Sequence, residues 1–168
     1  MDLLNEWSIK IAQAGVPEEV DLAPIFTQAF TQGGEVRESL FQRKKSSVEG
    51  AFGPGEIIAI FPWILRGIVE SAQWLFPILS SENVGRFITV VKDGLEIKEK
   101  ITPKQNLKAL PDDPYAPLKQ VIDSMSFELQ MSGLSVDQAD LVTFRVVRTL
   151  LDEPSSAALF IRQLENSK

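Results

Sequence analysis

The stretch that decides the fold is IIAIFPWILRGIVESAQWLFPIL, residues 57–79, in which apolar side chains fill most positions. Its length matches the roughly 20 apolar residues that cross a bilayer as a helix. However, Arg66 and Glu70 lie near its middle, and a charged side chain costs about 2.5–3.5 kcal/mol at a bilayer centre. Pro62 and Pro77 also interrupt regular hydrogen bonding. We therefore predict that residues 57–79 form a buried helix or helical hairpin at the centre of the fold.

The polar residues and prolines of this stretch fall three or four residues apart, which places them on one narrow stripe of a helix. They are Pro62, Arg66, Glu70, Gln73 and Pro77. The rest of the helix surface is apolar, so we expect other parts of the protein, or a partner, to cover most of it.

Helical spacing also precedes the central stretch. Apolar residues recur every three or four positions from Leu3 to Ala14, and Gly15 and Pro17 follow as stop signals. A second helix is predicted at 24–31, ended by two glycines, and a short amphipathic third helix over 36–45, with basic residues at its end.

Two interpretations are open for the residues after the stretch. Good N-cap residues at 80–83 and a helical period favour a helix from about 82 to 101. The alternative is one β-hairpin at about 87–101, because Asp93-Gly94 is a strong hairpin signal.

Four prolines between 102 and 117 predict an extended linker. Beyond it, residues 118–168 show three helical segments: Ser135 and Gln138 have the spacing of a capping box, and Pro154 interrupts the pattern. The predicted fold class is therefore all-α, a bundle around residues 57–79 with a C-terminal three-helix unit; the hairpin would make it α+β. The predicted regions are 1–101, 102–117 and 118–168, or a single domain.

The composition narrows the possible chemistry. Cys and His are both absent, which excludes thiolate catalysis, histidine general bases and zinc sites built on these residues. The glycines at 50–55 lack the Gly-Lys-Ser/Thr of a phosphate-binding loop. We therefore expect no enzymatic activity, no cofactor and no metal.

The charge balance bears on partners and location. With 17 Lys+Arg against 23 Asp+Glu, the chain is acidic, with a net charge of -6, which disfavours nucleic acid as a partner. The first residues lack the basic and apolar runs of a secretory signal, so we expect a cytoplasmic protein.

These observations favour a non-enzymatic helical protein-interaction module, with self-association into a homo-oligomer as one form of it. The central stretch carries more large apolar side chains than one small domain readily covers. Aromatic residues commonly dominate binding energy at interfaces. The predicted anchors are Phe61, Trp63, Trp74 and Phe76.

The alternative function is a membrane-active helical protein, interfacial or pore-forming, that uses residues 43–79. Arg43, Lys44 and Lys45 would contact an anionic surface, and the apolar face of 57–79 would enter the acyl boundary. Such insertion would require the native core to open.

Overall fold

The computed structural model describes residues 2–41, 59–81, 85, 87, 89, 91 and 116–166, and these are helical almost throughout, with no strand among them. In chain order, the elements are α1 (Leu3–Gly15), the 3-10 helix η1 (Pro17–Glu19), α2 (Ala23–Gln32), α3 (Gly34–Ser39), α4 (Phe61–Glu70), α5 (Ala72–Leu79), α7 (Ala116–Met131), α8 (Val136–Asp152) and α9 (Pro154–Glu165). The predicted all-α class is confirmed.

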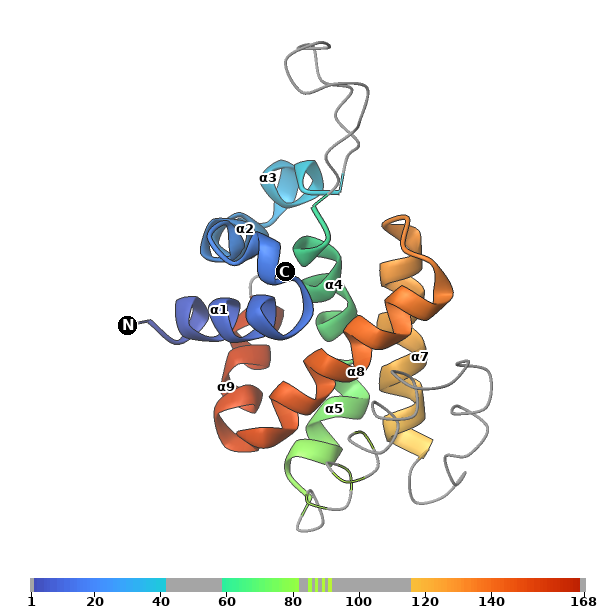
Figure 1. Cartoon of the computed structure of the whole chain (residues 1–168). Helices are drawn as coiled ribbons and strands as arrows, with labels where there is room; N and C mark the ends of the chain where they lie inside the picture. Colours follow the sequence, from blue (N-terminus) through green and yellow to red (C-terminus); the bar gives the residue numbers. More distant parts are fainter. Residues whose placement is uncertain are drawn as a thin grey trace.

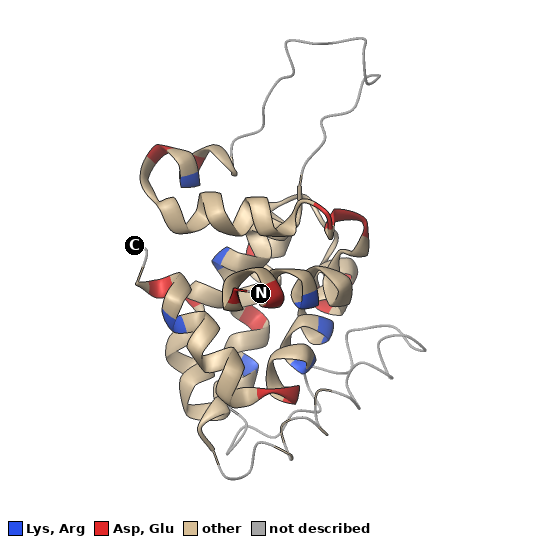
Figure 2. Cartoon of the chain, turned by 90° about the vertical axis from the view of Figure 1, so that its left-hand side faces the viewer, with Lys and Arg blue, Asp and Glu red and all other residues tan. Residues whose placement is uncertain are grey.

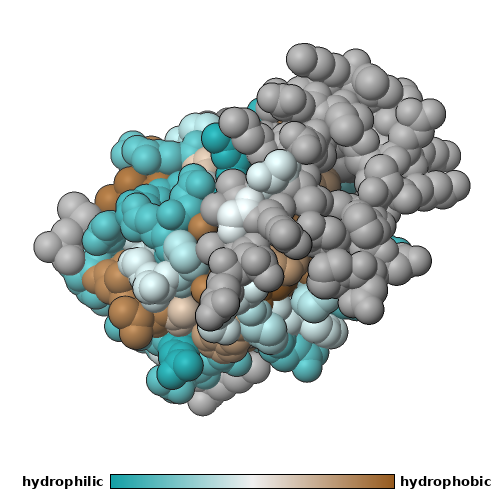
Figure 3. Space-filling view, turned by 90° about the horizontal axis from the view of Figure 1, so that it is seen from below, coloured by the Kyte–Doolittle hydropathy of each residue, from teal (hydrophilic) through white to brown (hydrophobic). Residues whose placement is uncertain are grey.

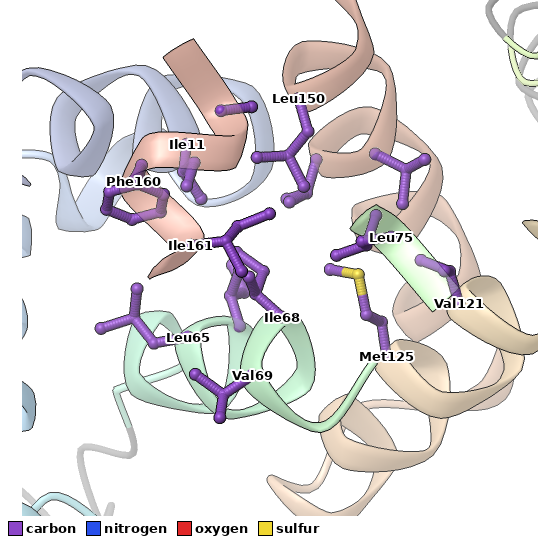
Figure 4. Close-up of a cluster of buried hydrophobic side chains, with 14 of the residues drawn as sticks. Ile11, Leu65, Ile68, Val69, Leu75, Val121, Met125, Leu150, Phe160 and Ile161 are labelled. Atoms are coloured by element: carbon purple, nitrogen blue, oxygen red, sulfur yellow. The ribbon is translucent and has the colours of Figure 1, made fainter. Parts of the chain in front are cut away.

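Helix α4 lies in the middle of the bundle, with α1, α2 and α9 on one side and α7 on the other, while α8 passes across (Figure 1). Buried side chains from α1, α4, α5, α7, α8 and α9 meet in one core (Figure 4). The helices on both sides of the predicted linker therefore share a core. The linker itself lies mostly outside the described residues.

The first and last described helices contact each other within this core. The ring of Trp7 in α1 stacks on Phe160 of α9 with 5.8 Å between the centroids. The Trp7 Nε1–H donates a hydrogen bond to Ser156 Oγ at 2.8 Å, so the one polar atom of this fully buried side chain has a partner.

The central stretch forms two consecutive helices, and the described part of it confirms a buried helical element. Ser71 separates α4 from α5, and its hydroxyl donates to the carbonyl oxygen of Gly67 at 2.6 Å. A serine bonded to the preceding turn in this way often bends a helix. In Figure 1, α5 leads away from the end of α4 instead of folding back along it, so the hairpin form of the prediction is wrong.

The predicted polar stripe is exposed except at its first residue. Arg66, Glu70, Gln73 and Pro77 are exposed, whereas Pro62 is buried. The correction has a simple cause, because the start of α4 packs against α2.

A carboxylate from a distant part of the chain caps the start of α4. Both oxygens of Glu19 accept hydrogen bonds from the backbone N–H of Ile60, at 3.0 and 2.9 Å, and Oε1 also accepts from Phe61 at 2.9 Å. The first N–H groups of a helix have no partner within the helix, and a negative charge there suits the helix dipole. Glu19 thereby ties η1 to α4.

Gly67 brings α4 close to α7. A Cβ added at Gly67 would lie 3.2 Å from the Cα and 3.2 Å from the Cγ of Met125. Both distances are shorter than ordinary contacts of a Cβ atom, and the first involves backbone that cannot turn aside. A side chain at position 67 would therefore require α7 to shift by a few tenths of an ångström.

Between α5 and α7, the described residues Gly85, Phe87, Thr89 and Val91 are all helical. The helix interpretation is thus confirmed at these positions, and the hairpin interpretation is wrong for its first residues. The rest of 82–101 lies outside the described residues. Within the described part of the chain, we find no helix whose length and apolar character would let it cross a membrane.

We predict that Gly67→Ala destabilises the protein, although alanine favours helix by about 1 kcal/mol over glycine. Overpacking against the Met125 backbone costs about 1–3 kcal/mol, so the expected net loss in urea unfolding is up to about 2 kcal/mol.

The matched control is Gly85→Ala, because Gly85 is helical and exposed with no atom near its added Cβ. This variant should gain up to about 1 kcal/mol from helix propensity. Equal effects of the two substitutions would contradict the close approach at Gly67.

We predict that stability falls as the pH rises from about 4 towards neutral. Glu19 and Glu128 are partly buried and Asp123 is exposed. Partial loss of solvent around each carboxyl is the largest influence on it and raises the pKa above its ordinary value of 4.5, 4.5 and 3.8, respectively. The folded state therefore binds these protons more tightly than the unfolded state. The stability that they contribute is fully present below the pKa of the unfolded state and is lost as the pH rises through the pKa of the folded state. Thermal melts across this range measure the trend.

Glu19→Gln isolates one of these groups, since the amide keeps an acceptor oxygen and does not ionise. Its melting temperature should fall less steeply with pH than that of the wild type. A wild-type stability that rises over this range would show that the assigned pKa direction is wrong.

Candidate functional site

The corner between α7 and α8 is closed by two local motifs, the first of which ends α7. Gly133 has φ +111°, and its N–H bonds to the carbonyl of Gln130 at 3.0 Å, while the N–H of Leu134 bonds to the carbonyl of Leu129 at 3.4 Å. This pair of bonds is a Schellman motif, in which glycine supplies the positive φ.

The second motif starts α8. Ser135 Oγ accepts from the N–H of Gln138 at 3.2 Å, and the Gln138 side chain accepts from the N–H of Ser135 at 3.4 Å, so the predicted capping box is confirmed. Ser126 Oγ also donates to Asp140 Oδ1 at 2.5 Å in the interior, which joins α7 to α8. The corner is therefore held from both sides.

Three large apolar side chains lie exposed around this corner, and we call them the corner patch. Phe127 is 60% exposed, Met131 56% and Val136 55%. Phe127 and Met131 are one turn apart on α7, so they are neighbours on its surface. Val136 begins α8, one turn nearer the corner than Asp140, which bonds to α7. The three residues therefore lie on the two helices on either side of the corner.

Four other large apolar residues are exposed in the described part of the chain: Leu22 and Ile25 at the start of α2, Val36 on α3 and Leu159 on α9. In the view from below, hydrophobic side chains form small groups between hydrophilic ones (Figure 3). Such scattered exposure is normal for a protein surface, whereas several large side chains at one place are more informative.

Two acidic side chains border the corner patch. Asp123 is exposed one turn before Phe127, and exposed Asp137 follows Val136. Lys119 lies a further turn beyond Asp123, and its charge lowers the pKa of that carboxyl less than burial raises it. The surroundings of the patch are thus acidic.

A second feature is a cleft of about 220 Å³ between α3 and α4, which we call the arginine cleft. Its lining residues are Arg37, Glu38, Phe41, Arg66, Val69 and Glu70. The guanidinium of Arg37 lies 3.7 Å from the centre of the Phe30 ring, and that of Arg66 lies 5.1 Å from Phe41 and 5.7 Å from Trp63. Both arginines are therefore held against aromatic rings.

The charges of the arginine cleft are nearly balanced. Burial, and to a lesser degree the charge of Arg66, lowers the pKa of Arg37, whereas Glu38 and Glu70 oppose this. The Nε of Arg66 also pairs with Glu128 Oε2 of α7 at 3.5 Å. With acidic groups on several sides, the cleft does not favour an anion. On the described residues of the face in Figure 2, basic and acidic side chains are likewise interspersed.

The structure does not bring the four predicted anchors together. Phe61 is fully buried and stacks on Phe26 at 6.3 Å, so it belongs to the core instead of an exposed surface. Trp63 is partly buried beside the arginine cleft, and Trp74 and Phe76 are partly buried on α5 beyond the bend. Arg162 of α9 lies 5.5 Å from the Phe76 ring and covers part of it.

Phe127 and Met131 were missed, yet the sequence contains the signal. The buried residues of α7 follow one helical stripe: Leu118, Val121, Ile122, Met125 and Leu129. At 100° per residue, Phe127 and Met131 fall on the opposite side of the helix from this stripe. Large apolar residues off the core stripe were thus visible as candidates for a surface contact.

The candidate membrane contacts Arg43, Lys44 and Lys45 lie outside the described residues. In the described part of 57–79, the apolar face of α4 and α5 is packed in the core. No group of three or more His, Cys, Asp or Glu residues in the described segments is placed to hold a metal ion. Known protein families, curated proteins and solved structures compared with the chain give no match.

We predict that Gly133→Ala destabilises the corner. The added Cβ meets no atom within 4 Å, so the cost is that of a positive φ for a residue with a side chain, about 1–2 kcal/mol. Chemical denaturation measures it, and Gln120→Ala on the exposed face of α7 should change stability by less than about 0.5 kcal/mol. An unchanged midpoint for Gly133→Ala would contradict the Schellman geometry.

Proposed function

We propose that this chain is a non-enzymatic helical protein-interaction module that binds a partner through the corner patch. The observation that carries the proposal is the exposure of Phe127, Met131 and Val136 at one helix corner. An aromatic side chain with apolar neighbours is a common anchor of an interface, because its burial removes a large apolar area from water.

The rigidity of the corner supports this role. Two capping motifs and the bond between Ser126 and Asp140 fix the backbone around the patch. A surface that is ordered before binding loses less conformational freedom when the complex forms. The absence of Cys and His from the sequence supports the non-enzymatic part of the proposal.

The arginine cleft is the weaker candidate. Arginine and tryptophan are common at interfaces, but Arg66 already pairs with Glu128 and both arginines already stack on rings within the protein. We do not put the membrane-active alternative forward, since the apolar side chains that it needs are those of the core.

Photo-crosslinking in cells tests the proposal. Replacing Phe127 with p-benzoylphenylalanine keeps an aromatic ring at the patch and makes it reactive towards a bound partner. The expected result is one or a few discrete crosslinked products. Adding Met131→Asp to the same chain should abolish them, because a charge would enter the apolar contact.

The matched control is p-benzoylphenylalanine at Leu159, which is 57% exposed on α9. It should give none of these products. Circular dichroism shows whether each variant stays folded, as expected for exposed positions. Identical products from both sites, or none from position 127, would contradict an interaction through the corner patch.

A further inference from the structure

Resting on the proposed function, we infer that the partner presents a basic amphipathic helix to the corner patch. The apolar part of the surface is small and helical in spacing, with Phe127 and Met131 one turn apart on α7. A ridge of this kind suits the apolar stripe of another helix, whose side chains recur at the same spacing.

The charge of the partner follows from the border of the patch. Asp123 and Asp137 flank the apolar side chains and form no salt bridge within the described residues. Arg66 of α4 is engaged by Glu128, and Lys119, one turn from Asp123 on α7, acts on that carboxyl through its charge without a salt bridge among the described residues. Lysine or arginine beside the partner's apolar stripe would meet these carboxylates, and the overall charge of -6 would speed the approach of a basic segment.

The same border argues against a second copy of this chain. In a two-fold symmetric dimer, each patch meets an identical patch. Asp123 and Asp137 of one copy would then approach those of the other, and like charges across an interface weaken it. A basic partner removes that repulsion and replaces it with attraction.

The test uses two synthetic amphipathic helical peptides of about 18 residues, or five turns. Both carry leucine on one stripe, and the remaining positions are mainly lysine in one peptide and mainly glutamate in the other. Binding to the full chain is measured by fluorescence anisotropy at low and moderate salt. We expect the lysine peptide to bind at least about tenfold more tightly and to weaken as salt is added.

Variants of the protein locate the binding. Phe127→Ala with Met131→Ala should weaken the lysine peptide about tenfold or more, whereas Leu159→Ala should leave it unchanged. Asp123→Asn with Asp137→Asn should weaken binding about threefold to tenfold and reduce its salt dependence. Melting curves of all variants establish that each one is folded.

Three results would overturn the inference: equal binding of the two peptides, no binding of either, or binding that Phe127→Ala with Met131→Ala does not weaken. A dimer of the free protein, seen by sedimentation and lost in that double variant, would also overturn it, because the second copy would be the occupant. Crosslinks from position 127 that persist in any of these cases would show that the patch binds a partner of different chemistry. Loss of the crosslinks themselves would instead overturn the proposed function.

Discussion

The close contact between α4 and α7 at Gly67 and Met125 sets the position of the surfaces described above. Because α4 has no side chain at Gly67, the backbone of α7 approaches it directly. On the outer edge of the same contact, Arg66 reaches Glu128, which precedes the last turn of α7. The distance between α7 and α4 at Gly67 therefore determines the position of the α7–α8 corner relative to the arginine cleft.

The interior polar groups show a second constraint, which concerns the register of α1 on α2. Ser8 is buried in α1, and its hydroxyl donates to Thr27 Oγ1 of α2 at 2.5 Å, while Thr27 donates to the carbonyl of Ala23 at 3.0 Å. Each buried hydroxyl thus has a partner, which a buried polar atom requires. Ser8 Oγ also lies 2.5 Å from the carbonyl oxygen of Leu4 in its own helix. Sliding one helix along the other would therefore lose the bond between the two hydroxyls without leaving either donor unsatisfied, and this bond favours one alignment among several apolar ones.

What the sequence predicted well depends on neighbours along the chain. Gly15, Gly33 and the Ser135–Gln138 pair mark helix ends through local chemistry, and the helices end where these signals lie. The cap of α4 by Glu19 was not predictable, because the donor and acceptor are 41 residues apart. The burial of Phe61 was missed for the same reason: it depends on the packing of α2, which periodicity does not reveal.

For the candidate site, Phe127 and Met131 could have been found from the core stripe of α7. The exposure of Val136 could not, since it lies in line with the buried residues of α8 and is exposed only because the core ends before it.

The pairing of Trp7 with Phe160 and Ser156 has a consequence for synthesis on the ribosome. Helix α1 is synthesised early, but its Trp7 side chain gains its contacts with Phe160 and Ser156 only after α9 has been made. During that interval, α1 and the central helices present apolar surface that α9 later covers, and such surface promotes aggregation of nascent chains. The core is therefore expected to close only after residues 154–165 have left the exit tunnel.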